Sequence, residues 1–328
     1  MENIVAYLAE PERFVFEKED VPPPEPGEVI LEVKASGLCS SEIPFFTGQA
    51  VCSDKEFIKY ARYPTPLGHE VVGRVVAVGR AVKNLVVGDR ATGLTVTGSG
   101  FCRYYREKEE NLVKAPENVA DEHALGEPIM CIINILRNSE PEIGDKVVVV
   151  GEGFMGLMLV SLLSRYPLEK LVLTGMSKMK LALGREFGAT HTINVLETDP
   201  YDALADILDG QQADVVVELA GSMKALTLCA FAVKPRWGKI IAPSYYAKHE
   251  PFEIGGYLMR KAPQFRPVHP AYSRDKFDDL RRGIWALGAG LLPMDRLITH
   301  RFKLEDLHEA FEVAARKEPD FIKGVLMP

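Results

Sequence analysis

The sequence predicts an α/β protein in which a small β-domain precedes a doubly wound parallel sheet. A change in the sequence pattern along the chain supports this prediction. Over about the first 120 residues, short alternating runs are broken by turn residues, whereas from Gly144 onward β-branched runs alternate with helical stretches. A length of 328 residues also favours two domains, at about 150 residues per domain.

Short strands are predicted in the first part of the chain. Residues 28–33 alternate with period two, and residues 71–78 form another strand-like run, which ends at Gly79. Residues 21–27 are rich in proline and form a rigid segment before the first of these runs, while residues 86–89 resemble a strand end and turn. Short strands separated by turns are typical of a partly open β-barrel or sandwich.

The second part alternates strands with helices. Predicted strands cover residues 146–150, 170–174, 191–194, 214–218 and 238–242, and predicted helices cover 154–165, 178–187, 202–208 and 223–233. The tail adds a helix at 304–316 and a strand at 321–327. Because the strand at 146–150 contains four consecutive valines, it is expected to be buried on both faces of a parallel sheet.

A glycine motif follows that buried strand directly. It has the form G-x-G-x-x-G and consists of Gly151, Glu152, Gly153, Phe154, Met155 and Gly156. At the start of a helix, such glycines allow a tight turn, the approach of a pyrophosphate and close packing of helix on strand. Within a βαβ unit the motif predicts dinucleotide binding. Glu152 is expected to face solvent, since its carboxylate would repel a pyrophosphate.

The end of the second strand bears on the choice of cofactor. NAD-specific folds place an acid there, about twenty residues after the motif, to bind the ribose 2′-hydroxyl. Gly175 occupies this position, and Ser177 and Lys178 follow it. A small residue followed by a hydroxyl and a cation leaves room and charge for a 2′-phosphate, so NADP(H) is expected ahead of NAD(H). The alternative is that Lys178 is only a solvated lysine at a helix start.

Three residues form a possible metal-binding set. Cys39, His69 and Glu127 offer a thiolate, an imidazole and a carboxylate, which together suit Zn²⁺. Each also has an ordinary interpretation on its own. Cys39 could be a small buried apolar residue, His69 a hydrogen-bonded core residue, and Glu127 an acid favoured at a helix start.

With the glycine motif, these residues resemble one family, the zinc-dependent medium-chain dehydrogenases, which include alcohol, sorbitol and threonine dehydrogenases. The matching stretches are residues 36–42, 68–79, 87–90, 127–131 and 147–156, in the family's order. The long match G-H-E-x-x-G-x-V-x-x-V-G at 68–79 is the most specific. The resemblance implies a GroES-like catalytic domain at 1–122, completed by 298–328, and a Rossmann domain at 123–297.

The resemblance also assigns roles to residues. It implies that Cys39, His69 and Glu127 ligate a single catalytic zinc. Glu70 would be a near or exchangeable ligand, and Cys131, one helical turn after Glu127, an alternative one.

Two further positions match the catalytic machinery of the family. Ser41 matches the proton-relay hydroxyl. Glu42 matches the acid that orients the histidine ligand, although many members have Asp there.

Some features depart from the family pattern. Many relatives carry a four-cysteine lobe for a second, structural zinc, but residues 91–119 contain a single cysteine, Cys102. No structural zinc of that type is therefore expected. Pro44 stands near the position of a relay histidine in some relatives, which implies a different proton path. Residues 49–63 lengthen the gap between Cys39 and His69 and are expected over the active-site cleft or on the surface.

Composition excludes several function classes. With 46 acidic and 39 basic residues the net charge is −7, which argues against nucleic-acid or membrane-surface partners. Five irregularly spaced cysteines favour a reduced, cytoplasmic protein over a disulfide framework. The first ten residues lack the pattern of a signal peptide, and no apolar stretch is long enough for a membrane span.

The expected activity is the interconversion of an alcohol and its carbonyl with a nicotinamide cofactor. The substrate is expected to be a polyol, sugar or secondary alcohol, and the family resemblance implies a homodimer or homotetramer. Polar residues that could contact such a substrate include Arg103, Tyr104, Tyr105, Arg260 and Arg266, although each is expected at the surface. The alternatives are a zinc-free quinone or enoyl reductase of the same superfamily and a non-catalytic cofactor-binding protein.

Overall fold

The computed structural model describes residues 1–49, 62–95, 99–246 and 255–328. By its contacts the chain divides into two compact units. The first comprises Met1–Met130, Phe277–Gly290 and Met294–Pro328, and the second comprises Cys131–Lys276 and Leu291–Pro293. Residues 123–130, 277–290 and 294–297 therefore belong by contact to the first unit, although the sequence analysis assigned them to the second domain.

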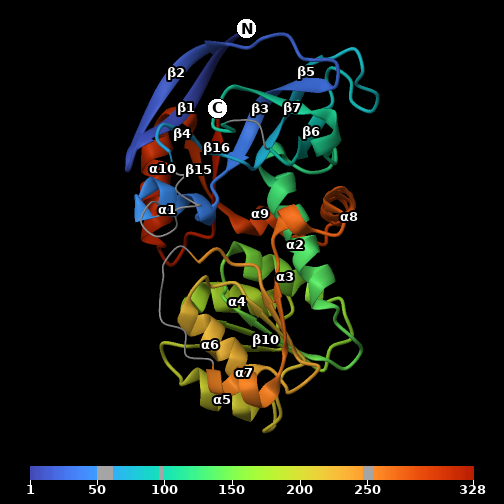
Figure 1. Cartoon of the computed structure of the whole chain (residues 1–328), viewed down its shortest axis with the longest axis vertical. Coiled ribbons are helices and arrows are strands. Elements are labelled where there is room, and N and C mark those ends of the chain that lie inside the picture. The colour runs from blue at the N-terminus through green and yellow to red at the C-terminus, as the bar shows by residue number, and fades with distance from the viewer. Residues whose placement is uncertain (50–61, 96–98, 247–254) are drawn as a thin grey trace. The chain divides into compact units, whose positions relative to one another are not determined.

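The first unit is built mainly from β-strands (Figure 1). These are β1 (Glu2–Glu10), β2 (Arg13–Asp20), β3 (Glu28–Gly37), β4 (Thr65–Pro66), β5 (Val71–Val78), β6 (Arg90–Gly93), β7 (Tyr104–Lys108), β8 (Leu112–Lys114), β15 (Ile298–Lys303) and β16 (Lys323–Met327). One sheet has the order β2-β1-β4, and a seven-stranded sheet runs β15-β16-β3-β5-β6-β8, with β7 paired to β3.

Alternating apolar residues account for the central pair of this sheet. Val29, Leu31 and Val33 share one face of β3 and are buried, and Val71 and Val75 do the same on β5. Since successive side chains of a strand point to opposite faces, this pattern buries one face of each strand. The two strands pair antiparallel along most of their length.

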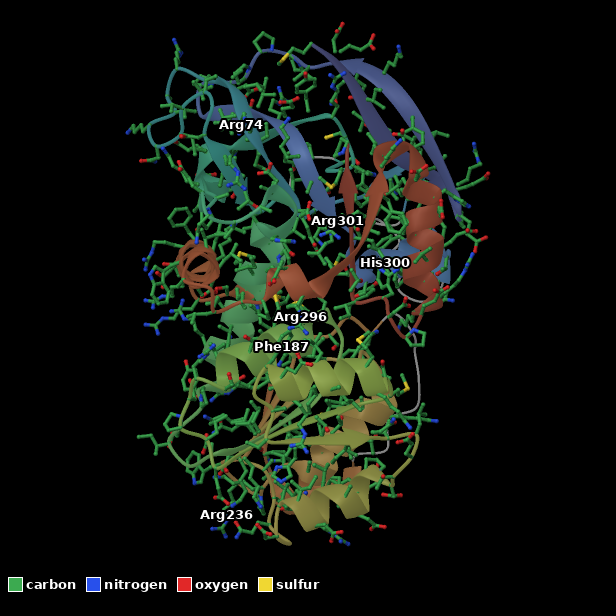
Figure 2. The ribbon with its side chains drawn as sticks, turned by 180° about the vertical axis from the view of Figure 1, so that it is seen from behind. Arg74, Phe187, Arg236, Arg296, His300 and Arg301 are labelled. Atoms are coloured by element: carbon green, nitrogen blue, oxygen red, sulfur yellow. The ribbon has the colours of Figure 1, made fainter. Side chains whose placement is uncertain are left out.

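The chain's tail returns to the first unit. β16 pairs with β3 through Val325 and Leu326, so residues far apart in sequence meet beside the end of β3. Arg301, which is labelled in Figure 2, lies on β15. Its Nη2 is 2.5 Å from Oε1 of Glu122, in an ion pair. Helix α10 (Leu307–Arg316) adds Leu307 and Phe311 to an apolar cluster. The helix and strand predicted for the tail are present, whereas β15 was not predicted.

The remaining helices of the first unit are short or lie at its edges. They are α1 (Ile43–Phe46), α8 (Lys276–Gly288) and α9 (Met294–Leu297), together with the first part of α2 (Gly126–Ser139). The start of α2 is fixed by Thr92 on β6. Its Oγ1 accepts the Gly126 N–H at 2.8 Å and donates to the Val71 carbonyl at 2.8 Å. This anchor determines where the first turn of α2, which carries Glu127, begins.

The second unit is a parallel sheet of six strands. The strands are β9 (Lys146–Val150), β10 (Lys170–Gly175), β11 (His191–Asn194), β12 (Val215–Glu218), β13 (Lys239–Ala242) and β14 (Gln264–Pro267), in the order β11-β10-β9-β12-β13-β14. Every pairing is parallel. This is the doubly wound order of dinucleotide-binding folds, in which the first strand lies in the middle. The predicted fold class is confirmed.

Five helices of this unit alternate with the strands: α3 (Phe154–Leu163), α4 (Lys178–Glu186), α5 (Pro200–Ile207), α6 (Met223–Ala232) and α7 (Gly255–Lys261). All five residues of β9 are buried, as its β-branched composition predicts. Among the residues that the structure describes, no helix is long and apolar enough to cross a bilayer.

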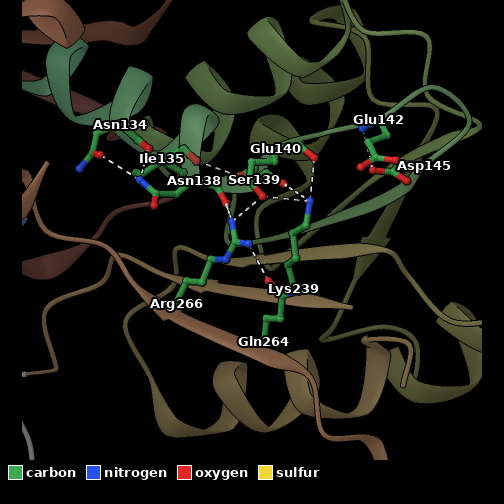
Figure 3. A network of polar contacts seen from close by, with 10 residues as sticks. All are labelled: Asn134, Ile135, Asn138, Ser139, Glu140, Glu142, Asp145, Lys239, Gln264 and Arg266. Carbon is green, nitrogen blue, oxygen red and sulfur yellow. Dashed lines mark hydrogen bonds and ion pairs between the residues drawn. The ribbon is translucent and has the colours of Figure 1, made fainter. Parts of the chain in front are cut away.

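Cations from two strands cover the last carbonyls of α2 at the amino edge of this sheet (Figure 3). Lys239 Nζ donates to the Glu140 carbonyl at 2.8 Å, and Arg266 Nη1 donates to the Asn138 carbonyl at 2.8 Å. These carbonyls have no partner within the helix, so the contacts satisfy groups that would otherwise need water. Arg266, considered above as a substrate contact, is engaged in this network.

Candidate metal centre and nucleotide site

Cys39 lies just beyond the end of β3. It precedes a single 3-10 turn, Ser40–Glu42, and its backbone is extended. The Ser41 hydroxyl donates to the Cys39 sulfur at 3.1 Å. The strand end and the turn together hold the thiol and a hydroxyl side by side in a half-buried position.

Glu42 is buried and connects this turn to His69. Its Oε1 accepts the Gly68 N–H at 2.6 Å and lies 2.9 Å from His69 Nδ1. With Nδ1 held by a carboxylate, Nε2 remains the ring nitrogen that can bind a metal. Gly68 itself has φ +88°, a conformation that favours glycine, and a Cβ there would lie 2.7 Å from the Phe101 backbone nitrogen.

Glu70 forms a buried ion pair with Lys323 of β16. Lys323 Nζ lies 2.7 Å from Oε1 and 2.6 Å from Oε2 of the carboxylate. Only the contact with Oε1 has hydrogen-bond geometry, so Oε2 accepts no hydrogen bond within the described part of the chain. Gly37 provides the space for this pair, because a Cβ there would lie 2.0 Å from Oε2.

The structure brings together Cys39, His69 and Glu70. Each offers a ligand atom, and these atoms lie within 4.8 Å of one another. A thiolate, an imidazole and a carboxylate are a donor set that fits Zn²⁺. Among the described residues Glu127 lies outside this group, at the start of α2, and Cys131 stands one turn further along that helix, in the second unit.

The residues at this centre shift one another's pKa values. Burial opposes protonation of His69, but the carboxylate of Glu42 and the thiol of Cys39 outweigh it and raise the pKa of the imidazole. Burial likewise opposes the Lys323 charge, and the carboxylate of Glu70 leads the groups that nevertheless raise its pKa. Glu127 contributes to that same rise. Lys323 is thus a permanent cation among the proposed metal-binding residues.

The glycine motif has the geometry of a nucleotide loop. Gly151 has φ +117°, which favours glycine, and a Cβ on Gly156 would lie 1.9 Å from the Gly151 carbonyl oxygen. Gly153 differs, because its φ is −72° and a Cβ there would meet no atom within 4 Å. Neither packing nor backbone conformation requires glycine at 153, whereas the approach of a pyrophosphate to the backbone does. Phe154 and Met155 follow in the first turn of α3.

The expectation that Glu152 faces solvent is wrong. Its Oε1 accepts backbone N–H groups from Met176 at 2.8 Å and Ser177 at 3.0 Å, in the turn after β10. A Cβ built on Gly175 would lie 2.2 Å from Oε2 of Glu152. Two N–H donors thus draw the carboxylate across to the neighbouring strand end, and the room expected beside Gly175 is filled.

The two residues expected to bind a 2′-phosphate have other partners. The Ser177 hydroxyl caps α4 by accepting the Lys180 N–H at 3.4 Å. Lys178 Nζ lies 2.6 Å from the Glu197 carboxylate, and both side chains are largely exposed. Of the polar residues considered for substrate, Tyr105 is buried and donates to Glu107 at 3.1 Å.

Sequence reasoning missed Lys323 and Thr92. Lys323 is 253 positions from Glu70, and the only local signal was a lysine at the start of an otherwise apolar strand, KGVLM. Thr92 lies in a short strand that the pattern did not identify. Most of the insertion at 49–63, namely residues 50–61, lies outside the described residues.

Models of known domain families match both halves of the chain. A model of the alcohol dehydrogenase GroES-like domain matches residues 25–127, and a model of the zinc-binding dehydrogenase domain matches residues 155–273. Sorbitol dehydrogenase 2 of Saccharomyces cerevisiae is 29% identical over 343 aligned positions, which cover 92% of this chain and 91% of that protein.

Solved structures share the fold across the whole chain. A putative zinc-binding dehydrogenase from Sinorhizobium meliloti 1021 bound to NADP has a TM-score of 0.85 at 22% identity and covers all of both chains. An alcohol dehydrogenase from Escherichia coli CFT073 in complex with NADH has a TM-score of 0.85 at 23% identity and covers 100% of this chain and 99% of that one. The two domain models, which match in the expected order, show that the chain belongs to the zinc-type medium-chain dehydrogenases.

Proposed function

We propose that this protein is a zinc-dependent oxidoreductase that interconverts a polyol, sugar or secondary alcohol and its carbonyl, with a nicotinamide dinucleotide as hydride carrier. The observation that carries the proposal is the group formed by Cys39, His69 and Glu70 in a chain that also has the complete glycine motif. A structural role for the motif alone would not require a thiol, an imidazole and a carboxylate to converge.

Each residue at the centre has a defined task. When bound, zinc supplies a Lewis acid that acidifies an alcohol, and the oxidised nicotinamide accepts a hydride. Ser41, beside the Cys39 sulfur, takes the proton of the substrate hydroxyl and passes it towards solvent. Glu42 holds the imidazole of His69 in one tautomer and orientation.

For the third protein ligand we propose Glu127, with Glu70 as an exchangeable one. Lys323 already neutralises Glu70, which weakens that carboxylate as a permanent donor to a cation. Glu127 stands in the first turn of α2, whose start is anchored by Thr92, and its charge acts on Lys323. Its carboxylate therefore belongs to the same electrostatic centre.

The substrate class rests on the relatives and on one departure from the wider family. The curated relative quoted above is a sorbitol dehydrogenase. Residues 91–119 contain one cysteine, so this chain shares no four-cysteine lobe with the members that bind a structural zinc. Both points favour polyols and secondary alcohols over simple primary alcohols. A homodimer or homotetramer in the cytoplasm remains part of the proposal.

The end of β10 gives no support to the expected preference for NADP(H). That expectation depended on open space beside Gly175, and the Glu152 carboxylate occupies that space. The proposed cofactor is therefore a nicotinamide dinucleotide.

Steady-state turnover tests the proposal. The purified protein is assayed with sorbitol, xylitol, 2,3-butanediol, ethanol and a quinone, each with both cofactors, before and after treatment with a zinc chelator. We expect oxidation of the polyols or of the secondary diol, loss of activity on chelation and recovery with added Zn²⁺. Chelator-resistant reduction of the quinone would contradict the proposal and favour a zinc-free reductase.

Matched cysteine variants locate the activity. Cys39→Ser should abolish turnover, whereas Cys102→Ala should retain it. Cys102 lies in the core, where its thiol donates to the Tyr104 carbonyl at 3.2 Å, and it is not part of the group formed by Cys39, His69 and Glu70. Equal activity in both variants would exclude Cys39 from the metal centre.

A further inference from the structure

Glu152 occupies an unusual position for a residue of a nucleotide loop. It stands between the first two glycines of the motif, at the carboxyl end of β9, and its carboxylate reaches the end of β10. The two strands are adjacent and parallel, with Val150 opposite Thr174, so their carboxyl ends lie at one edge of the sheet. That edge is where dinucleotides bind in doubly wound folds.

The Glu152 carboxylate takes the place of a side chain at position 175. The three atoms nearest to a Cβ built on Gly175 are Oε2, Cδ and Cγ of Glu152, at 2.2, 2.3 and 2.7 Å. In NAD-specific folds, the side chain at this strand end is the acid that accepts the hydrogen bond of the ribose 2′-hydroxyl. Here the same volume holds a carboxylate that comes from the preceding strand.

The carboxylate is held in a fixed position before any ligand binds. Oε1 accepts two N–H groups, from Met176 and Ser177, at the turn into α4. Both donors belong to the backbone, so the contact depends on no flexible partner. A pre-positioned acceptor keeps more of its interaction energy for the ligand than a mobile one does.

The same geometry disfavours a 2′-phosphate. A phosphate would bring about two negative charges next to an existing carboxylate, and this repulsion is large at short range. The compensating groups are engaged elsewhere, since Lys178 pairs with Glu197 and the Ser177 hydroxyl caps α4. The N–H groups of Met176 and Ser177, in the turn just before α4, already hold Glu152, and the Lys180 N–H in the first turn of the helix is bound by the Ser177 hydroxyl.

We propose that Glu152 is the residue that selects the cofactor, and that this protein prefers NAD(H), whose ribose has a free 2′-hydroxyl, over NADP(H). The inference rests on the proposed function for the use of a dinucleotide. It reverses the preference expected from Gly175 alone, because the acid missing from the end of β10 is supplied by the glycine loop.

Calorimetric binding of ADP-ribose and 2′-phospho-ADP-ribose tests the inference without turnover. These ligands lack nicotinamide, so the result does not depend on zinc or on the substrate. We expect the parent protein to bind ADP-ribose at least about tenfold more tightly, since one charge-assisted hydrogen bond contributes about 1.5–3 kcal/mol and 1.4 kcal/mol is a factor of ten.

Two glutamine variants isolate the charge. Glu152→Gln keeps the shape and an oxygen acceptor for Met176 and Ser177 but removes the negative charge, so the affinity ratio should fall by at least about tenfold. Glu142→Gln removes an equal charge from the loop before β9, at the opposite edge of the same sheet, and should leave the ratio within about twofold.

A double variant tests whether the position of the carboxylate, and not the residue that carries it, sets the preference. Glu152→Ala with Gly175→Asp returns the carboxylate to the strand end, and Gly175 has a backbone conformation open to other residues. We expect this variant to recover the preference for ADP-ribose that Glu152→Ala alone loses. Recovery would also show that the loss in the single variant does not come from misfolding.

The outcomes separate the two proposals. A parent protein that prefers 2′-phospho-ADP-ribose, or a Glu152→Gln variant with an unchanged ratio, would overturn this inference and leave the proposed dehydrogenase intact. A parent protein that binds neither ligand would overturn the dinucleotide site itself and, with it, the proposed function.

Discussion

Lys323 has an environment in which its loss alone is costly to the first unit. Its side chain and that of Glu70 are almost fully buried, and each is the other's opposite charge. Burying two ions is costly, so such a pair adds little stability compared with apolar residues, but removing one partner leaves an uncompensated buried charge. The pair also holds Glu70 beside Cys39 and His69.

We therefore predict that Lys323→Met lowers the free energy of unfolding by about 3–5 kcal/mol. The double variant Glu70→Gln with Lys323→Met should recover most of this loss, because neither charge then remains buried. Urea unfolding of the parent protein and of the two variants measures both values. Lys303→Met, at an exposed lysine of β15, is the control and should change the value by less than about 0.5 kcal/mol. A Lys323→Met variant as stable as this control would contradict the buried pair.

Single substitutions also test which residue is the third metal ligand. Glu127→Gln should lower zinc affinity by at least about tenfold, since replacing a ligating carboxylate costs at least as much as altering the partner of a ligand. It should leave thermal unfolding nearly unchanged, since the half-buried side chain is expected to ligate rather than to pack. Competition with a zinc-binding dye measures the affinity. If Glu127→Gln retains zinc and turnover while Cys131→Ser loses both, Cys131 is the ligand.

Local sequence was informative about single residues wherever the partners are close in the chain. Cys39, Ser41 and Glu42 lie in one turn, and His69 and Glu70 follow each other, so motif spacing identified them together. The partners of Glu70 and Glu152 could not be found in this way. Lys323 reaches its partner only because the tail pairs with β3, and the carboxylate of Glu152 turns towards the neighbouring strand because backbone donors are available there.

Elements with a strong pattern were the most predictable. The predicted bounds of β5, β9 and β11 agree with the structure, because a glycine or a turn follows each run. The hairpin of β1 and β2 was not predicted, since β2 carries many charged residues and is largely exposed. Short strands such as β6 and β15 depend on pairing with distant strands, which no local pattern reveals.

A lysine from another helix binds the carbonyls at the end of helix α6. Lys261, the last residue of α7, donates to the carbonyls of Ala230 at 3.2 Å and of Phe231. Its Nζ also lies 5.6 Å from the centre of the Phe231 ring and 5.5 Å from that of Tyr257. Burial lowers the pKa of this lysine from 10.5 to about 8.

This shift gives stability a dependence on pH. Between pH 8 and 10.5 the unfolded chain keeps a proton on Lys261 that the folded chain has released, so the free energy of unfolding should rise with pH. Urea unfolding at pH 7.5 and 9.5 measures the rise. In Lys261→Met this contribution should be absent, and the difference between parent and variant should therefore grow with pH. A constant difference would show that Lys261 titrates as an ordinary lysine.

At the scale of the whole molecule, the two units carry different parts of the proposed chemistry. The first holds Cys39, His69 and Glu70, and the second holds the glycine motif and Glu152. The division into two domains and both fold types followed from the change in sequence pattern. The boundaries did not, because α8 is an amphipathic helix whose sequence does not show which core it joins.

The central claim is that one zinc is bound at the centre formed by Cys39 and His69. Elemental analysis of protein purified without chelator and dialysed against metal-free buffer tests it most directly. The account predicts about one zinc per chain in the parent protein and close to none in Cys39→Ser, since a closed four-cysteine site for a second ion is lacking. A parent protein with close to no zinc would contradict the account and favour a zinc-free reductase, and a value near two would show a second site that the account denies.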